Sequence, residues 1–134
     1  MNIADVMDEL GTALETITGL RVFPYSATRV TPPAAIVGWP DPIEYDLTMG
    51  RGADQFTLPV FVLVGNVDAR SARDALAVYL DGSATGSIKA ALDGGTYTEC
   101  DSVRVASASV DAITSAGVEY LGAVFQVEIT GSGA

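Results

Sequence analysis

Phe56-Thr57-Leu58-Pro59-Val60-Phe61-Val62-Leu63-Val64 is the most strongly β-forming run of the sequence. Apolar residues occupy every second position from Phe56 to Val64, which is typical of a strand with one face in the core. Pro59 has no backbone N–H to donate to a sheet ladder, so its presence predicts an edge strand or a bulge. This run therefore places a β-sheet at the centre of the expected fold.

Further alternating or short apolar runs predict the other strands of this sheet. Downstream, residues 102–112 and 118–130 alternate and are joined by the turn Thr114-Ser-Ala-Gly117. Such a short link favours an antiparallel hairpin. Upstream, Gly and Pro residues separate three shorter runs. These predicted strands cover residues 20–25, 34–39 and 43–48.

Three segments carry the three-and-four spacing of an amphipathic helix. Residues 2–18 have an apolar face, with Asn2 as the expected N-cap and Gly19 as the expected stop. Residues 69–80 form the second predicted helix, after a cap at Asp68. A short third helix is expected to begin at Ser87 and to end at Gly94-Gly95.

The resulting order is helix, four strands, two helices and two strands. Strands that come mostly in adjacent pairs favour an antiparallel or mixed sheet with helices packed on one face. We therefore expect a single α+β domain over residues 1–134, with 130–134 as a loose C-terminal tail. A sheet covered on one side leaves a second face, which must be polar or meet a partner.

The composition excludes several classes of function. The chain of 134 residues has 7 basic and 17 acidic residues, a net charge of -10, no histidine and a single cysteine. The missing histidine removes His-based catalysis and His metal sites, and one cysteine forms neither an intrachain disulfide nor a Cys zinc site. The acidic balance argues against phosphate-neutralising proteins and against docking on an anionic membrane. No run approaches the ~18 apolar residues of a membrane-spanning helix.

Few residues form a recognisable chemical pattern, and each has a structural interpretation as well. The loop Gly82-Ser-Ala-Thr-Gly86-Ser-Ile-Lys89 lacks the spacing of a phosphate-binding loop. Acidic neighbours should raise the pKa of Cys100, which favours an inert thiol. Trp39 and Tyr45 flank a Pro-Asp-Pro turn and suit either a binding patch or, more often, core or turn packing. An acidic group suits a solvated surface or, less often, a hard cation; it comprises Asp41, Glu44, Asp46 and Asp54.

Several segments, in order along nearly the whole chain, resemble the small tail terminator (tail completion) proteins of long-tailed bacteriophages, especially those of actinobacterial phages. The segments are Pro32-Pro-Ala-Ala-Ile-Val37, Gly50-Arg-Gly-Ala-Asp54, Leu58-Pro-Val-Phe-Val-Leu-Val-Gly65, Asp68-Ala-Arg-Ser-Ala72, Tyr79-Leu80, Ser87-Ile-Lys-Ala-Ala-Leu92 and Glu119-Tyr-Leu-Gly-Ala123. The family's usual order of helices and strands agrees with the order predicted above.

The resemblance implies a virion protein that acts by assembly, without catalytic residues, cofactor or metal. It implies a hexameric ring of identical subunits that caps the tail tube, ends tail polymerisation and presents a surface to the head-side connector or stopper protein. Its expected place is the head–tail junction of a virion assembled in the host cytoplasm. DNA would pass through the ring without specific binding, and acidic subunits would repel its phosphates.

The segment 41–54 is the expected contact with the ring or the tube, because it is long, polar and Gly-rich and joins two strands. Its candidate interface residues are Asp46, Met49, Arg51 and Asp54. Arg51 and Asp54 suit a pair across subunits, or ordinary loop charges. The alternatives in the same class are a tail tube subunit and a head–tail joining subunit. From a different class we retain a small acidic ligand-binding domain or a histidine-free enzyme, which should carry a concave apolar pocket.

Overall fold

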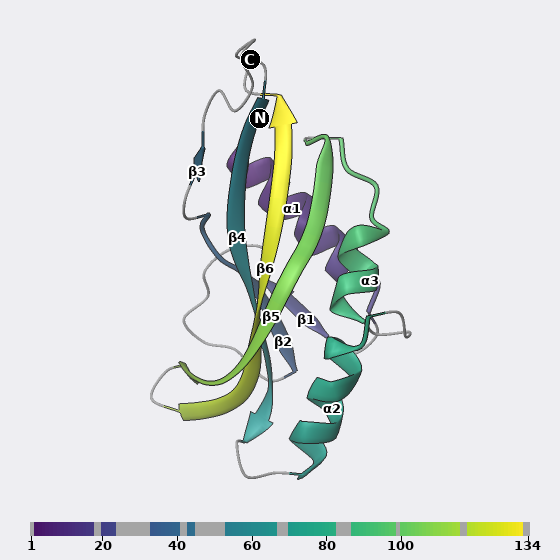
Figure 1. Ribbon diagram of the computed structural model, residues 1–134. Coiled ribbons are helices and arrows are strands. Elements are labelled where there is room, and N and C mark those ends of the chain that lie inside the picture. The colour runs from purple at the N-terminus through teal and green to yellow at the C-terminus, as the bar shows by residue number, and fades with distance from the viewer. Residues whose placement is uncertain are drawn as a thin grey trace.

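The computed structural model describes residues 2–17, 20–23, 33–40, 43–44, 53–66, 70–82, 87–98, 100–115 and 118–132. They form a single α+β domain with a mixed sheet and three helices, and the elements follow the predicted order (Figure 1). The helices are α1 (Ile3–Leu14), α2 (Arg70–Leu80) and α3 (Ile88–Asp93). The strands are β1 (Arg21–Phe23), β2 (Ala34–Val37), β3 (Ile43–Glu44), β4 (Ala53–Asn66), β5 (Ser102–Ser115) and β6 (Val118–Ser132).

The sheet has the strand order β1-β2-β4-β6-β5, and β3 also pairs with β4. Strands β1 and β2 are parallel, whereas every other described pair is antiparallel. The three longest strands, β4, β5 and β6, cross the whole molecule and curl together toward one end (Figure 1). The sheet is therefore mixed, which is one of the two forms that the sequence predicts.

One core joins the helices to a single face of this sheet. In β4 the buried residues Phe56, Leu58, Val60 and Val62 alternate with half-buried ones, and β6 repeats the pattern. The same core cluster contains buried side chains of all three helices, among them Leu10, Leu76 and Leu92. Because successive residues of a strand point to opposite faces, the helices pack on one side, and we call the opposite side the open face.

Pro59 lies in the interior of the sheet, so the expectation of an edge strand is wrong, and the ladder has no bulge at this residue. β4 pairs with β6 on one side and with β2 and β3 on the other. The carbonyl oxygen of Pro59 accepts the N–H of Gly38, at 2.8 Å. In an antiparallel strand, the N–H and the carbonyl of one residue point to the same side. The side on which Pro59 lacks an N–H is therefore the side of Gly38, between β3 and β2, and no hydrogen bond to β6 is lost.

The ends of the elements differ from the predicted ones in several places. Helix α1 ends at Leu14 rather than at residue 18, because Ile17 N–H donates to the carbonyl of Leu14 in a tighter turn, at 3.0 Å. Strand β2 ends at Val37, before Trp39. The strands β4, β5 and β6 are longer than predicted. The expected stop at Gly19 and the expected cap at Asp68 lie outside the described residues.

The expected caps of the other two helix starts are confirmed. The side chain of Asn2 accepts the N–H of Asp5 at 3.2 Å, and the hydroxyl of Ser87 accepts the N–H of Ala90 at 3.1 Å. Gly94 caps the C-terminal end of α3, as the sequence predicts. In β4, Gly65 has a φ of 150°, which side-chain-bearing residues rarely adopt, and it lies where the register with β6 shifts.

Candidate assembly surface

Most of the interface residues named from the sequence lie outside the described part of the chain. Asp46, Met49 and Arg51 are among them, so their roles stay predictions. Asp54 is described: it lies in β4 opposite Gly131 of β6 and is half-buried. The acidic group named from the sequence is also only partly described: Glu44 and Asp54 lie in strands, whereas Asp41 and Asp46 lie outside the described residues.

The open face carries rows of side chains that the strand register sets side by side. One row is apolar and runs from Ile36 through Phe61 to Val124, all half-buried, and it ends at the exposed Ser109. On one side of it, three rows are largely hydroxyl and amide groups; they contain Gln55, Thr57, Pro59, Ser102, Arg104, Ser107, Gln126, Glu128 and Thr130. On its other side, a row runs from the fully buried Ala34 and Leu63 through Gly122 to the exposed Asp111.

Two opposite charges in the three polar rows cancel each other. Arg104 of β5 and Glu128 of β6 are register partners and form an ion pair, with 2.9 Å between the guanidinium nitrogen and the carboxylate oxygen. Both side chains are exposed to solvent. Exposed pairs of this kind stabilise a fold only slightly, but this one neutralises two charges of the open face, on a chain whose total is -10.

Gly38 allows a tight contact at the β2 end of the open face. A Cβ atom at this position would lie 2.8 Å from the ring of Pro59 and 3.1 Å from the ring of Phe61. The next residue, Trp39, is 65% exposed. Core packing of Trp39, the more frequent role of such a residue, is therefore wrong for this chain, while its suggested companion Tyr45 lies outside the described residues.

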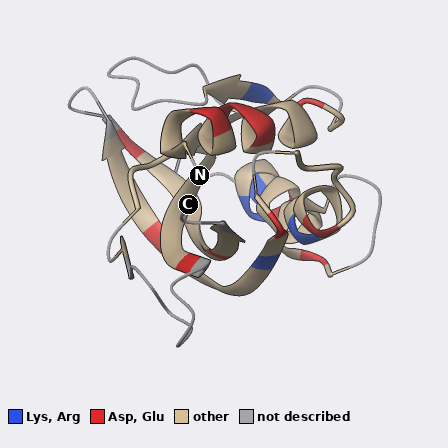
Figure 2. Cartoon of the chain, turned by 90° about the horizontal axis from the view of Figure 1, so that it is seen from above, with Lys and Arg blue, Asp and Glu red and all other residues tan. Residues whose placement is uncertain are grey.

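Part of the acidic charge lies on the opposite side of the molecule, where α1 faces solvent. Asp5 and Asp8 are exposed on this helix and Glu15 is exposed at its C-cap, and its last turn carries no basic residue. Figure 2 shows the acidic positions of α1 in red. The carboxylate of Glu9 accepts the backbone N–H of Thr98 at 2.8 Å and its hydroxyl at 3.2 Å, which ties α1 to the segment before β5.

A cavity of about 480 Å³ opens beside this acidic helix. Its walls come from α1 and from the chain after α3, where a Cβ on Gly95 would lie 2.7 Å from the Tyr97 hydroxyl. The polar groups on its wall are the Glu9 carboxylate and three threonine hydroxyls. It is lined by Glu9, Thr12, Ala13, Thr16, Gly94, Gly95 and Thr96, which include none of the large apolar side chains that usually line a small-molecule pocket.

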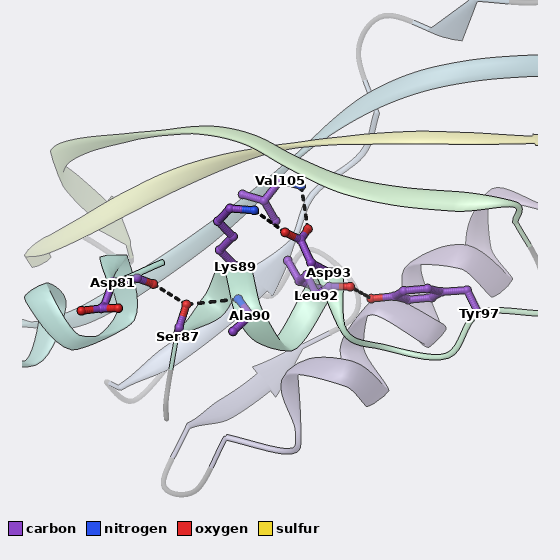
Figure 3. A network of polar contacts seen from close by, with 8 residues as sticks. All are labelled: Asp81, Ser87, Lys89, Ala90, Leu92, Asp93, Tyr97 and Val105. Carbon is purple, nitrogen blue, oxygen red and sulfur yellow. Dashed lines mark hydrogen bonds and ion pairs between the residues drawn. The ribbon is translucent and has the colours of Figure 1, made fainter. Parts of the chain in front are cut away.

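A network of polar contacts joins α2, α3 and β5 (Figure 3). Asp93 holds Lys89 on one carboxylate oxygen and the N–H of Val105 on the other. The hydroxyl of Ser87 donates to the carbonyl of Asp81 and accepts from Ala90. The network connects backbone groups and helix ends, and so its evident role is to position the elements.

In the described ranges, no three His, Cys, Asp or Glu side chains gather as a metal site would need. Burial raises the pKa of Tyr97 well above its usual value, and the neighbouring Cys100, Asp93 and Glu9 add to the shift. A tyrosine that holds its proton this firmly and donates to the carbonyl of Leu92 at 2.5 Å is a packing group rather than a base. Cys100 is buried.

Sequence reasoning missed the exposure of the second half of β5. Residues from Ala106 to Ala112 are exposed, and Val110 is 56% exposed. The register with β6 shifts between Val105 and Ser107. The run of small residues after this shift is the feature of the sequence from which the exposure could have been predicted. Small side chains bury little area, so the strand there lies beyond the cover of the helices.

Comparisons with known proteins leave the family open. The chain matches no model of a known protein family, and its sequence has no significant match among curated proteins. None of the described helices is long and apolar enough to cross a membrane.

Proposed function

We propose that the chain is a tail terminator of a long-tailed bacteriophage, which closes into a homo-oligomeric ring on the end of the tail tube. The ring, hexameric in the family that the sequence resembles, would end polymerisation and offer its other surface to the head-side connector. The protein would act by assembly, without cofactor or chemistry. Two lines of support are the resemblance of ordered segments such as Leu58–Gly65 and the order of helices and strands.

The observation that carries the proposal is the one-sided cover of the sheet. All three helices share one core on one face, and the open face carries an apolar row from Ile36 to Val124 and the mutually paired Arg104 and Glu128, with Asp111 at its β5 edge. Copies of a chain with a net charge of -10 repel one another. A face with an apolar row and few charges is the surface on which that repulsion is smallest and burial is most favourable. It therefore suits contacts between subunits.

A ring needs heterologous contacts, in which one surface of a subunit meets a different surface of the next. In this proposal the segment 41–54 supplies the second surface, with Asp46, Met49, Arg51 and Asp54 as its contact residues. The acidic side of α1 then faces away from subunit contacts. Acidic groups that line or flank a DNA conduit repel phosphates, and this limits adhesion of DNA during its passage.

Localisation and copy number test the proposal together. We would label particles of the phage that encodes the chain with an antibody and immunogold, and count its copies per particle by quantitative mass spectrometry. A single label at the head–tail junction, with the copies of one ring, is the expected result. Label along the whole tail at high copy number would assign a tube subunit instead. Absence from particles would favour a binding domain or an enzyme.

A charge reversal tests the segment 41–54 separately. Arg51→Glu should impair tail completion, while the purified variant keeps the thermal unfolding midpoint of the wild type. Arg73→Glu on α2 is the matched control, because it makes the same change of charge at an exposed position. Normal tails and normal infectivity in the Arg51 variant would remove this segment from the proposed contact.

A further inference from the structure

The sequence contains Asp-Gly twice, at Asp81-Gly82 and at Asp93-Gly94. In an Asp-Gly pair a carboxyl side chain closes readily on the next backbone nitrogen, because glycine has no side chain to obstruct the approach. The first pair directly follows α2, the second lies at the end of α3, and all four residues are exposed. Exposure therefore does not distinguish the two pairs, whereas their hydrogen bonds do.

Three contacts restrain the pair Asp93-Gly94. The carboxylate of Asp93 contacts Lys89 with one oxygen and accepts the N–H of Val105 with the other, at 3.1 Å (Figure 3). The N–H of Gly94 donates to the carbonyl of Ala90 at 3.0 Å. Before this nitrogen could attack the carboxyl group of Asp93, all three contacts would have to break. The folded structure therefore opposes ring closure at this pair.

The backbone nitrogen of the pair Asp81-Gly82 has no such restraint. Within the described part of the chain, the N–H of Gly82 donates to no other group. Nothing lies within 4 Å of the position that a Cβ atom on Gly82 would take, so the backbone can turn there without a clash. Figure 3 shows the carboxylate of Asp81 directed away from Ser87, which contacts the backbone carbonyl of Asp81 instead. The nitrogen of this pair thus has no hydrogen bond to lose before it attacks.

We propose that Asp81-Gly82 is a site of spontaneous isomerisation to isoaspartate. The nitrogen of Gly82 attacks the side-chain carboxyl carbon of Asp81 and forms a C–N bond. One molecule of water leaves, made of the amide proton and the hydroxyl group of the protonated carboxyl, and a five-membered succinimide ring results. Water then opens this ring at either carbonyl carbon, which gives aspartate again or isoaspartate. In isoaspartate the chain runs through the side-chain carbon, and the mass of the protein is unchanged.

The modification changes the connection between α2 and α3. The backbone carbonyl of Asp81 accepts the hydroxyl of Ser87, which is only 1% exposed, and in isoaspartate this carbonyl becomes a carboxylate. The charge then lies just past Leu80, the last residue of α2, where the helix dipole disfavours an anion. The chain also gains one backbone atom at this point. We therefore expect the isomerised protein to be less stable than the unmodified one.

Prolonged incubation of the purified chain tests the site, and the test does not depend on the proposed tail function. The protein is kept warm in a mildly acidic buffer, in which a fraction of the carboxyl groups is protonated as the reaction requires. Protease digests are then analysed by chromatography and electron-transfer fragmentation, which distinguish isoaspartate from aspartate. We expect isoaspartate to accumulate at Asp81 roughly tenfold faster than at Asp93, or more, because three contacts must break first at Asp93.

The same incubation in concentrated urea isolates the contribution of the fold. Unfolding removes the contacts of Asp93-Gly94, so the two pairs should form isoaspartate at similar rates. A difference that persists in urea would overturn the inference, because the neighbouring residues in the sequence would then set the two rates. Equal rates in the folded protein would also overturn it, as would the absence of isoaspartate at Asp81.

Two variants test the chemistry in the folded chain. In Gly82→Ala the added methyl group hinders the approach of the nitrogen and meets no other atom of the structure. This variant should keep the thermal unfolding midpoint of the wild type and form isoaspartate much more slowly. Asp81→Asn should form the same succinimide faster, with loss of ammonia, and a mass change reports it.

The isomerised protein itself tests the effect on the fold. Separated from the unmodified protein by chromatography, it should unfold at a midpoint lower by a few degrees. An equal midpoint would overturn the expected loss of stability. A folded Asp81→Asn variant that keeps its amide through the incubation would show that the two groups cannot meet, and would overturn the site.

Discussion

The carboxylate of Asp93, the last residue of α3, accepts the backbone N–H of Val105 in β5 at 3.1 Å. The contact lies at the register shift of β5, where the ladder with β6 skips a residue. Because β5 is the last strand of the sheet, the N–H of Val105 on its outer side has no described strand to bond, and a buried N–H without an acceptor is costly. The carboxylate of Asp93 satisfies this N–H. The short helix α3 and the irregular strand are therefore fitted to each other by a single side chain.

Two substitutions of Asp93 should separate the stability contributed by its hydrogen bond to Val105 from that contributed by its ion pair with Lys89. Asp93→Ala removes both, and we expect a loss of about 1–3 kcal/mol in the free energy of unfolding, because the N–H of Val105 is left without an acceptor. Asp93→Asn keeps an oxygen acceptor and loses only the surface pair with Lys89, which is worth about 0.5 kcal/mol or less. Urea unfolding of both variants measures the difference, and equal losses would contradict this role.

The two helix caps should differ in their contribution to stability. Ser87 is 1% exposed and its hydroxyl both caps α3 and donates to the carbonyl of Asp81. Ser87→Ala removes both bonds in a buried place, so we expect a loss of about 2 kcal/mol. Asn2→Ala removes a single exposed cap bond of α1 and should cost about 1 kcal/mol or less. Thermal unfolding of the two variants side by side checks the order, which a larger effect at Asn2 would refute.

The sequence predicts the elements and their order well, because apolar periodicity and capping chemistry are local. The alternation from Phe56 to Val62 and the cap at Ser87 both appear in the structure as expected, whereas Leu63 is buried and Val64 half-buried where the register with β6 shifts. The position of Pro59 in the sheet was predicted wrongly. Its tolerance in an interior strand depends on where β2 and β3 end, and no local pattern contains that information.

The candidate surface was predictable only in part. A sheet with helices on one face follows from the order of elements, and so does the existence of an open face. The charge balance of that face depends on the register that sets Arg104 beside Glu128, 24 residues away along the chain. The exposure of Val110 depends on how far α3 extends over β5. Both are long-range relations that the spacing of residues does not reveal.

Gly122 should tolerate no side chain. A Cβ atom there would lie 2.5 Å from the carbonyl oxygen of Val62 and 2.7 Å from the terminal methyl of Ile113. The carbonyl belongs to the neighbouring strand β4 and cannot move without the sheet, so Gly122→Ala should cost about 1–3 kcal/mol. Gly82→Ala is the control, since nothing lies within 4 Å of its Cβ position. Urea unfolding should show a change of less than about 0.5 kcal/mol for the control.

Stability at alkaline pH should depend on Tyr97. Burial raises the pKa of its hydroxyl above the value of about 10 in the unfolded chain, so the folded state holds this proton more tightly. The associated stability is fully present below about pH 10 and is lost as the pH rises from there through the higher pKa of the folded state. We therefore expect the free energy of unfolding of the wild type to fall above about pH 10.

Tyr97→Phe removes this titration together with the hydrogen bond to Leu92. At pH 8 the variant should be less stable than the wild type, by about 0.5–1.5 kcal/mol. Its stability should fall less steeply above about pH 10, and Tyr79, whose pKa burial also raises, accounts for part of the fall that remains. The difference between the two proteins should therefore shrink as the pH rises. Urea unfolding at pH 8, 9, 10 and 10.5 measures it, and a constant difference would show that Tyr97 titrates alike in both states.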